Sequence, residues 1–188
     1  MLIVEWLLLD INETNCYVAA CASTKQAMVV DPGEYDDRIA EIVARLGLDV
    51  RYVLITHDHY DHTGGVNEVV GRFGGEVVSG GRSGGGRLVK DGDCVQLGNL
   101  EGTVLCTPGH TPDSVCLAIA DHVFVGDAVF AGAVGGTASR AQHEQLVEAI
   151  ENKIFPLGDH VRIHTGHGPC TTVSIERRYN PFFHRSSI

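Results

Sequence analysis

Hydrophobic and polar positions divide the chain into short segments, most of which have the length and pattern of β-strands. Such runs predict strands at residues 3–9, 16–20, 27–30, 52–55, 76–78, 94–97, 103–106, 114–119, 122–125 and 161–163. Apolar residues at helical spacing predict a helix from Asp36 to Gly47, and others at residues 66–73, 146–154 and 174–179. Strands followed by a helix occur twice in the same order. Two stacked sheets with helices on their outer faces are therefore expected.

Residues 79–87 form a low-complexity segment, with five glycines and no apolar side chain. A solvated connection is favoured over a mobile lid above a substrate, and both interpretations stay open. No linker divides the chain, so residues 1–188 are predicted to form a single domain.

The composition is that of a folded protein, with 44% hydrophobic and 20% charged residues. No apolar run is long enough to cross a bilayer, so no membrane association is expected. The net charge of −10 argues against nucleic acid, because phosphate binding requires a basic face. A small-molecule substrate is the expected partner, and no feature indicates an oligomeric state.

The six cysteines form no Cys-x-x-Cys pair, which predicts free thiols and a cytoplasmic protein. Cys106 and Cys116 lie in apolar runs and are expected to be buried. Cys170 is expected to be a small packed residue rather than a nucleophile, since no neighbour in the sequence would activate its thiol.

Four segments share one layout, in which an apolar strand ends and a short polar loop carries histidine or aspartate. They are residues 54–62, 106–110, 123–127 and 163–168. Loops at the ends of neighbouring strands converge at a common rim of a sheet. The candidate metal ligands on these loops are His57, His59, Asp61, His62, His110, Asp127 and His167.

The strongest signal is the His-x-His-x-Asp-His pattern of residues 57–62. Burying four such groups as ordinary core would require a partner for each, and a metal ion satisfies them together. Imidazole and carboxylate without thiolate suit Zn, Fe, Mn or Co. Seven ligands exceed a single tetrahedral site and fit two ions that share a carboxylate. A histidine-rich surface loop is the disfavoured alternative.

His110 or Asp127 alone would be interpreted as a turn residue, and each counts here because it occupies the same strand-end position. Asp58 is not predicted to be a ligand. His143 and His160 are expected on the surface, and His164 at the rim of the site, where it would support a ligand.

Taken in order, Thr-His-x-His-x-Asp-His, Pro-Gly-His, Gly-Asp and Gly-His-Gly-Pro resemble the metallo-β-lactamase-fold hydrolases. The resemblance extends from Asn-Cys-Tyr at residues 15–17 to Glu-Arg-Arg-Tyr-Asn-Pro-Phe at residues 176–182. It is strongest to short glyoxalase II-like proteins, which are hydroxyacylglutathione hydrolase homologues. It implies an α+β fold, a four-layer αββα sandwich of two mixed β-sheets with helices on the outer faces. An additional C-terminal glutathione-binding helical domain is not expected.

The resemblance also implies how the ligands are shared. One metal would take His57, His59 and His110, the other would take Asp61, His62 and His167, and Asp127 would bridge them. Asp61 and Asp127 are thus the predicted catalytic carboxylates, with a metal-bridging hydroxide as the nucleophile. The expected cofactor is two divalent metal ions, with Zn preferred over Fe or Mn.

Gly136 departs from the family pattern, because relatives often carry a basic residue there. The remaining candidates to bind a glutathione carboxylate are Arg140, Lys153, Arg177 and Arg178, of which the last two are equally suited to brace the fold.

Three functions follow from these features. The first is a dinuclear hydrolase that cleaves a thioester such as S-lactoylglutathione. The alternative is a mononuclear iron persulfide dioxygenase on the same fold, with His57, His110 and Asp127 as a facial triad. A protein that only stores metal is the third and least favoured. The number of bound metal ions distinguishes the first two.

Overall fold

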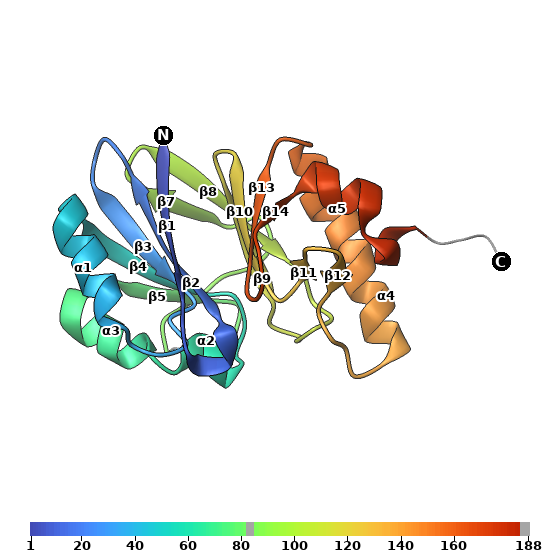
Figure 1. The fold of residues 1–188 in the computed structure, drawn as a ribbon, viewed down its shortest axis with the longest axis horizontal. Coiled ribbons are helices and arrows are strands. Elements are labelled where there is room, and N and C mark those ends of the chain that lie inside the picture. Colours follow the sequence, from blue (N-terminus) through green and yellow to red (C-terminus); the bar gives the residue numbers. More distant parts are fainter. Residues whose placement is uncertain (82–84, 185–188) are drawn as a thin grey trace.

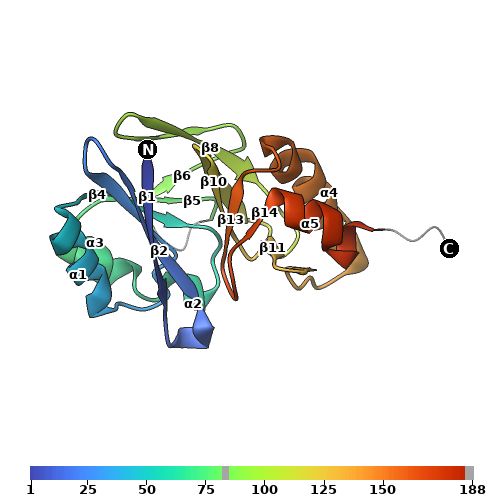
Figure 2. The ribbon, with the colours of Figure 1, turned by 45° about the horizontal axis from the view of Figure 1, so that its top comes forward.

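The computed structural model describes residues 1–81 and 85–184, and it has four layers (Figures 1 and 2). Two six-stranded sheets face each other, and helices cover the outer face of each. The fold is therefore the expected αββα sandwich. No helix in the described residues is long and apolar enough to cross a membrane.

The first sheet has the order β1-β2-β3-β4-β5-β6. Its strands are β1 (Leu2–Leu8), β2 (Asn15–Cys21), β3 (Gln26–Val30), β4 (Asp49–Ile55), β5 (Glu76–Ser79) and β6 (Arg87–Leu88). The first three are antiparallel neighbours, and the pairs from β3 to β6 are parallel. The sheet is therefore mixed. Helices α1 (Asp37–Leu46) and α3 (Val66–Phe73) pack on its outer face. The short helix α2 (Tyr60–Thr63) lies between β4 and α3 in the chain.

The second sheet has the order β14-β13-β10-β9-β8-β7. Its strands are β7 (Cys94–Leu97), β8 (Leu100–Cys106), β9 (Val115–Ile119), β10 (His122–Gly126), β13 (Arg162–Thr165) and β14 (Thr171–Thr172). A small hairpin of β11 (Val129–Phe130) and β12 (Ala133–Val134) follows β10. Helices α4 (Arg140–Ala149) and α5 (Val173–Tyr179) lie on the outer side of this sheet.

The main core lies between the two sheets. Tyr17 of the first sheet meets Phe124 of the second edge to face, with ring centroids 5.5 Å apart. Leu54 and Leu117 are also buried in this layer, at 2% and 0% exposure. Two further clusters join each sheet to its helices. Burial of a large apolar side chain contributes about 1.5–3 kcal/mol, so the facing strand surfaces hold the sandwich together.

Local sequence signals set the ends of helix α1. The Asp36 side chain accepts a hydrogen bond from the Arg38 backbone N–H at 2.8 Å, which caps the first turn. Gly47 ends the helix with φ of +62°, a conformation that costs glycine little. Both predicted ends are confirmed, and α3 has the predicted bounds.

Several elements differ from the sequence prediction. The expected helix through residues 146–154 is α4 followed by a π-helical turn at Ile150–Ile154. The two-residue strands β6, β11, β12 and β14 are too short to show an alternating pattern, so the sequence did not predict them. Part of the expected glycine-rich connection, residues 82–84, lies outside the described residues.

Candidate metal centre

The loops after four strands meet at one edge of the two sheets. Strands β8, β10 and β13 run in the same direction, because antiparallel β9 lies between β8 and β10 and β13 is parallel to β10. Their ends carry His110, Asp127 and His167. The end of β4 in the other sheet carries the loop from residue 56 into α2. The structure therefore brings all seven candidate ligands together, as the strand-end layout predicts.

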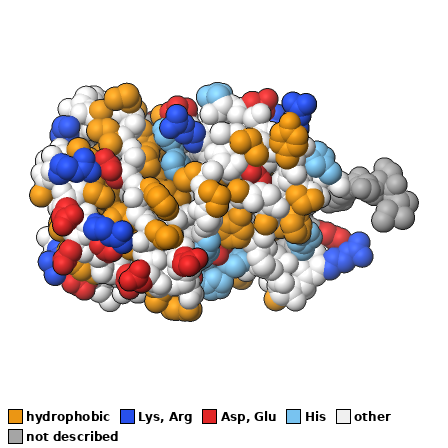
Figure 3. All heavy atoms as spheres, in the orientation of Figure 1, with side chains coloured by type: hydrophobic (Ala, Val, Ile, Leu, Met, Phe, Trp, Pro, Cys, Tyr) orange, Lys and Arg blue, Asp and Glu red, His pale blue; other side chains and the backbone are white. Residues whose placement is uncertain are grey.

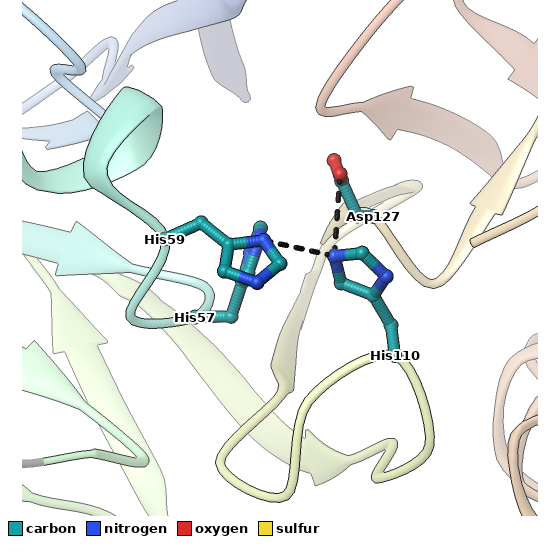
Figure 4. A group of neighbouring side chains, drawn as sticks. All are labelled: His57, His59, His110 and Asp127. Atoms are coloured by element: carbon teal, nitrogen blue, oxygen red, sulfur yellow. Dashed lines mark hydrogen bonds and ion pairs between the residues drawn. The ribbon is translucent and has the colours of Figure 1, made fainter. Parts of the chain in front are cut away.

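The first group of ligands comprises His57, His59, His110 and Asp127 (Figure 4). His59 Nδ1 lies 3.0 Å from His57 Nε2 and 3.1 Å from His110 Nε2. Asp127 Oδ2 is 3.5 Å from His110 Nε2. One ligand atom from each residue falls within 4.8 Å of all the others. Three ring nitrogens and a carboxylate oxygen facing one point are the donor set of a Zn²⁺ or Fe²⁺ site.

The second group comprises Asp61, His62 and His167. His167 Nε2 lies 3.5 Å from Asp61 Oδ2. This group also faces Asp127, whose Oδ1 is 3.5 Å from His62 Nε2 and whose Oδ2 is 3.6 Å from His167 Nε2. The Asp127 carboxylate therefore lies between the two groups.

Two buried atoms support the fit of metal ions to these residues. His62 Nε2 and Asp127 Oδ1 are inaccessible to solvent and make no hydrogen bond within the described residues. Buried polar atoms without partners are rare, because each costs about 1–3 kcal/mol. A divalent cation beside each atom would remove this cost, and the oxygen and nitrogen donors suit Zn, Fe or Mn.

The electrostatic environment differs from one candidate ligand to the next. Burial and the neighbouring imidazoles lower the pKa of His57, so its ring is neutral and able to donate a lone pair. Burial also disfavours a protonated His62, but the carboxylates of Asp31, Asp127 and Asp61 outweigh burial and raise its pKa. Burial raises the pKa of Asp127 despite the histidines around it. A cation at the centre would favour the ionised carboxylate.

Asp31, which lies outside both ligand groups, orients two of the candidate ligands. Its carboxylate accepts from Thr56 N–H at 2.8 Å and from Thr56 Oγ1 at 2.7 Å, and lies 3.0 Å from His62 Nδ1. Thr56 Oγ1 is in turn 3.1 Å from His57 Nδ1. A signal was present in the sequence, because Asp31 directly follows the apolar run of β3, as the candidate ligands follow theirs.

Close backbone approach explains two of the glycines around the ligands. A Cβ on Gly166 would overlap Asp127 Oδ1 and crowd the His62 ring, so only hydrogen fits there. Gly126 has φ of +50°, and a Cβ there would overlap the Thr56 side chain. These contacts hold the ends of β10 and β13 against the loop after β4.

Three further side chains named in the sequence analysis, Asp58, His143 and His160, lie outside the two ligand groups. Asp58 belongs to neither ligand group, and its backbone N–H donates to Asp113 Oδ2. His160 is exposed and His143 half-buried against the Phe182 ring.

His164 was expected at the rim of the metal centre, and this prediction is wrong. Its ring is 7% exposed and stacks on Phe124 in the layer between the sheets, where it contacts Tyr17 and His122. The side chain points into the core because alternate residues of β13 face that layer.

All six cysteines are free thiols. Cys116 is buried as predicted, whereas Cys106 is only half-buried at the end of β8. Cys170 was expected to be packed, yet it is exposed in the turn before β14. Sequence alone did not show this, because the exposure of a turn residue depends on which strand lies opposite it.

Both the sequence and the fold of this chain are similar to those of known proteins. Residues 9–82 match the family model described as "Metallo-beta-lactamase superfamily". The chain is 29% identical to hydroxyacylglutathione hydrolase GloC of Haemophilus influenzae, over 87% of this chain and 90% of the relative. It is 32% identical to the solved ETHE1 of Myxococcus xanthus, with a TM-score of 0.86 over 95% of this chain and 83% of that one. TTHA1623, solved in a di-iron-bound form, is 26% identical with a TM-score of 0.78, over 95% of this chain and 99% of that one.

Proposed function

This chain belongs to the metallo-β-lactamase superfamily, and we propose that within it the protein is a dinuclear metal-dependent hydrolase of thioesters. The observation that carries the proposal is the position of Asp127. Its carboxylate lies close to histidines of both ligand groups: Oδ2 is 3.5 Å from His110 Nε2 of the first group, and Oδ1 is 3.5 Å from His62 Nε2 of the second. A carboxylate between two complete sets of ligands is suited to bridge two ions.

The proposed ions are two divalent metals, with zinc favoured over iron or manganese. Bound at this centre, they would polarise an acyl carbonyl and lower the pKa of water to near neutrality. The similarity to TTHA1623, which binds two irons, supports the number of ions. The similarity to a hydroxyacylglutathione hydrolase supports the thioester.

The chain's own residues position this chemistry. Asp31 holds the His62 ring at Nδ1, and Thr56 holds the His57 ring at Nδ1. The Nε2 atoms of both rings therefore point into the site. Gly136 O lies 2.7 Å from His110 Nδ1 and holds its ring in the same way. No serine or cysteine nucleophile is required by this arrangement.

Metal analysis together with one pair of variants tests the dinuclear centre. Protein saturated with zinc is expected to bind close to two ions per chain. Asp127→Ala should abolish thioesterase activity and lower the metal content of the protein. Asp58→Ala, the matched change at a neighbouring carboxylate outside both groups, should lower metal content much less. One ion per chain at saturation, or equal losses from the two variants, would contradict the proposal.

Glutathione itself is expected to contribute little to substrate selection. Recognition of its carboxylates requires available cations, and Gly136 provides no side chain where relatives often carry a basic residue. Lys153 binds Asp91 at 2.6 Å, and Arg177 binds Asp159 at 2.8 Å, so these two brace the fold. The ratio of kcat/KM between S-lactoylglutathione and a short lactoyl thioester should stay below about a thousandfold, or about 4 kcal/mol. A larger ratio would reveal a dedicated glutathione site.

The alternative is a mononuclear iron dioxygenase that uses His57, His110 and Asp127. The similarity to ETHE1 is equally compatible with it. Iron-loaded protein that consumes oxygen with a glutathione persulfide, holds one ion per chain and leaves thioesters intact would establish this function instead.

A further inference from the structure

The turn that joins β1 to β2 lies beside helix α2, which carries two ligands of the second group (Figure 1). Two successive residues of this turn, Asn12 and Glu13, have left-handed backbones with φ of +50° and +54°. Asparagine is among the few residues other than glycine that tolerate this conformation. Figure 3 shows histidine and acidic side chains together at the lower edge of the molecule, where the turn lies. A segment outside the four strand-end loops therefore reaches the candidate metal centre.

The backbone of the turn is fixed to the loop that carries His167. Asn15 N–H donates to Gly166 O at 2.7 Å, and Thr14 and His167 pair as an isolated antiparallel bridge. Glu13 O lies 3.4 Å from His167 Nδ1. A carbonyl oxygen can only accept, so a proton on Nδ1 faces it and the lone pair of Nε2 is left for a metal ion. The turn thus orients one ligand of the second group through its backbone.

The Asn12 side chain contacts another ligand of the same group. Its Nδ2 donates to Asp61 Oδ2 at 3.1 Å and to the Tyr60 hydroxyl oxygen at 2.6 Å. A carboxylate can only accept, so the nitrogen of the amide, and not its oxygen, faces Asp61. The two acceptors together fix the rotation of the amide. Asp61 Oδ2 is also the oxygen that lies 3.5 Å from His167 Nε2, so Asn12 holds the carboxylate where it meets the next ligand.

Each ligand of the second group therefore has a partner outside the group. His62 has Asp31, His167 has the turn carbonyl, and Asp61 has Asn12. Asp31 is only 2% exposed, whereas Asn12 is exposed on the surface. The contact of Asn12 with Asp61 can therefore be removed without opening the core.

We propose that Asn12 is a positioning residue that sets the affinity of the second ion, the one held by Asp61, His62 and His167. The inference rests on the dinuclear centre of the proposed function. A hydrogen bond to an ionised carboxylate is stronger than one between neutral groups, so the amide resists rotation of the Asp61 carboxylate. Loss of such a partner typically lowers metal affinity about 10- to 100-fold. The first ion should be affected little, because its ligands belong to loops outside the turn.

The test is Asn12→Gly in the zinc-loaded protein. Glycine adopts the left-handed conformation readily, so the change removes the amide and keeps the backbone of the turn. Chelator competition with metal analysis at equilibrium measures the affinity for each ion. The affinity for the second ion should fall about 10- to 100-fold, and that for the first should change by no more than about twofold. Urea denaturation of the apo protein should show little loss of stability, because the side chain is exposed.

Tyr60→Phe is the matched control. It removes the other acceptor of the Asn12 amide and leaves the contact with Asp61, so both affinities should stay within about twofold of the wild type. An unchanged affinity for both ions in Asn12→Gly, an equal fall in both, or an equally large fall in Tyr60→Phe would overturn the assignment.

Thioesterase activity provides a second measurement. Asn12→Gly should lose activity at a zinc concentration that just saturates the wild type, and regain it when zinc is raised about 100-fold. Activity that does not return would mean that the variant damages more than metal affinity, and would contradict the positioning role. Wild-type protein that binds two zinc ions but leaves thioesters intact would refute the proposed hydrolase, while the two affinities would still decide the role of Asn12. One ion per chain in the wild type would refute both.

Discussion

Replacement of Asp31 by asparagine tests whether a residue outside both ligand groups controls the proposed metal centre. The Asp31 carboxylate lies 3.0 Å from His62 Nδ1 and accepts two hydrogen bonds from Thr56. If the asparagine amide faces His62, Nδ1 must become the acceptor, and the ring proton moves to Nε2, the atom that faces Asp127. If the amide faces Thr56 instead, the buried Thr56 N–H loses its acceptor.

Each orientation of the asparagine amide has an energetic cost. Loss of a hydrogen bond that orients a metal-ligating histidine typically lowers metal affinity about 10- to 100-fold, equivalent to about 1.4–2.7 kcal/mol. An unsatisfied Thr56 N–H would instead lower the free energy of unfolding of the metal-free protein by about 1–3 kcal/mol. Because Asp31 is only 2% exposed, water cannot compensate in either case.

Chelator competition, followed by metal analysis at equilibrium, measures the first quantity, and urea denaturation of the apo protein measures the second. Asp31→Asn should lower the affinity of the site for one of the two proposed ions. Binding of the other ion, held by His57, His59 and His110, should change less. Asp58→Asn is the control for charge. Wild-type affinity for both ions together with unchanged stability would refute the role assigned to Asp31.

Two further predictions follow from local geometry. Gly166→Ala should displace Asp127 and lower the proposed thioesterase activity by at least about tenfold. The control is Gly136→Ala, where a Cβ meets no atom within 4 Å and which should fold and bind metal as the wild type does. Equal metal content and activity in the two variants would contradict the close approach of Gly166 to Asp127. Asp36→Ala should lower the free energy of unfolding by about 1 kcal/mol at pH 7 through loss of the helix cap. Because Arg38 holds the pKa of Asp36 below 3.8, the stability difference between wild type and variant should shrink as the pH falls through that pKa. Urea titrations at several pH values measure this difference, and a difference that grows on acidification would contradict the assigned role of Asp36.

The elements that were predicted correctly are those with strong local signals. Helix α1 has an aspartate cap at one end and Gly47 at the other, and these act within a few residues. The position of Asp31 at a strand end is visible in the sequence, but its contact with His62 is not, because His62 lies 31 residues away in the chain. What the Asp31 side chain contacts depends on how β3 and β4 pair.

The sequence by itself determined the family, the layered fold and the candidate ligands, because closely spaced histidines and aspartates at strand ends have few uses other than metal binding. Only the tertiary structure decided which carboxylate lies between the two ligand groups and which one orients His62. It also decided that His164 faces the core and that Cys170 is open to solvent beside it. These outcomes depend on contacts such as that of His122 with His164, which are 42 residues apart and meet only when β10 pairs with β13. Spacing along a chain encodes local geometry, whereas the pairing of distant strands determines which side chains become neighbours.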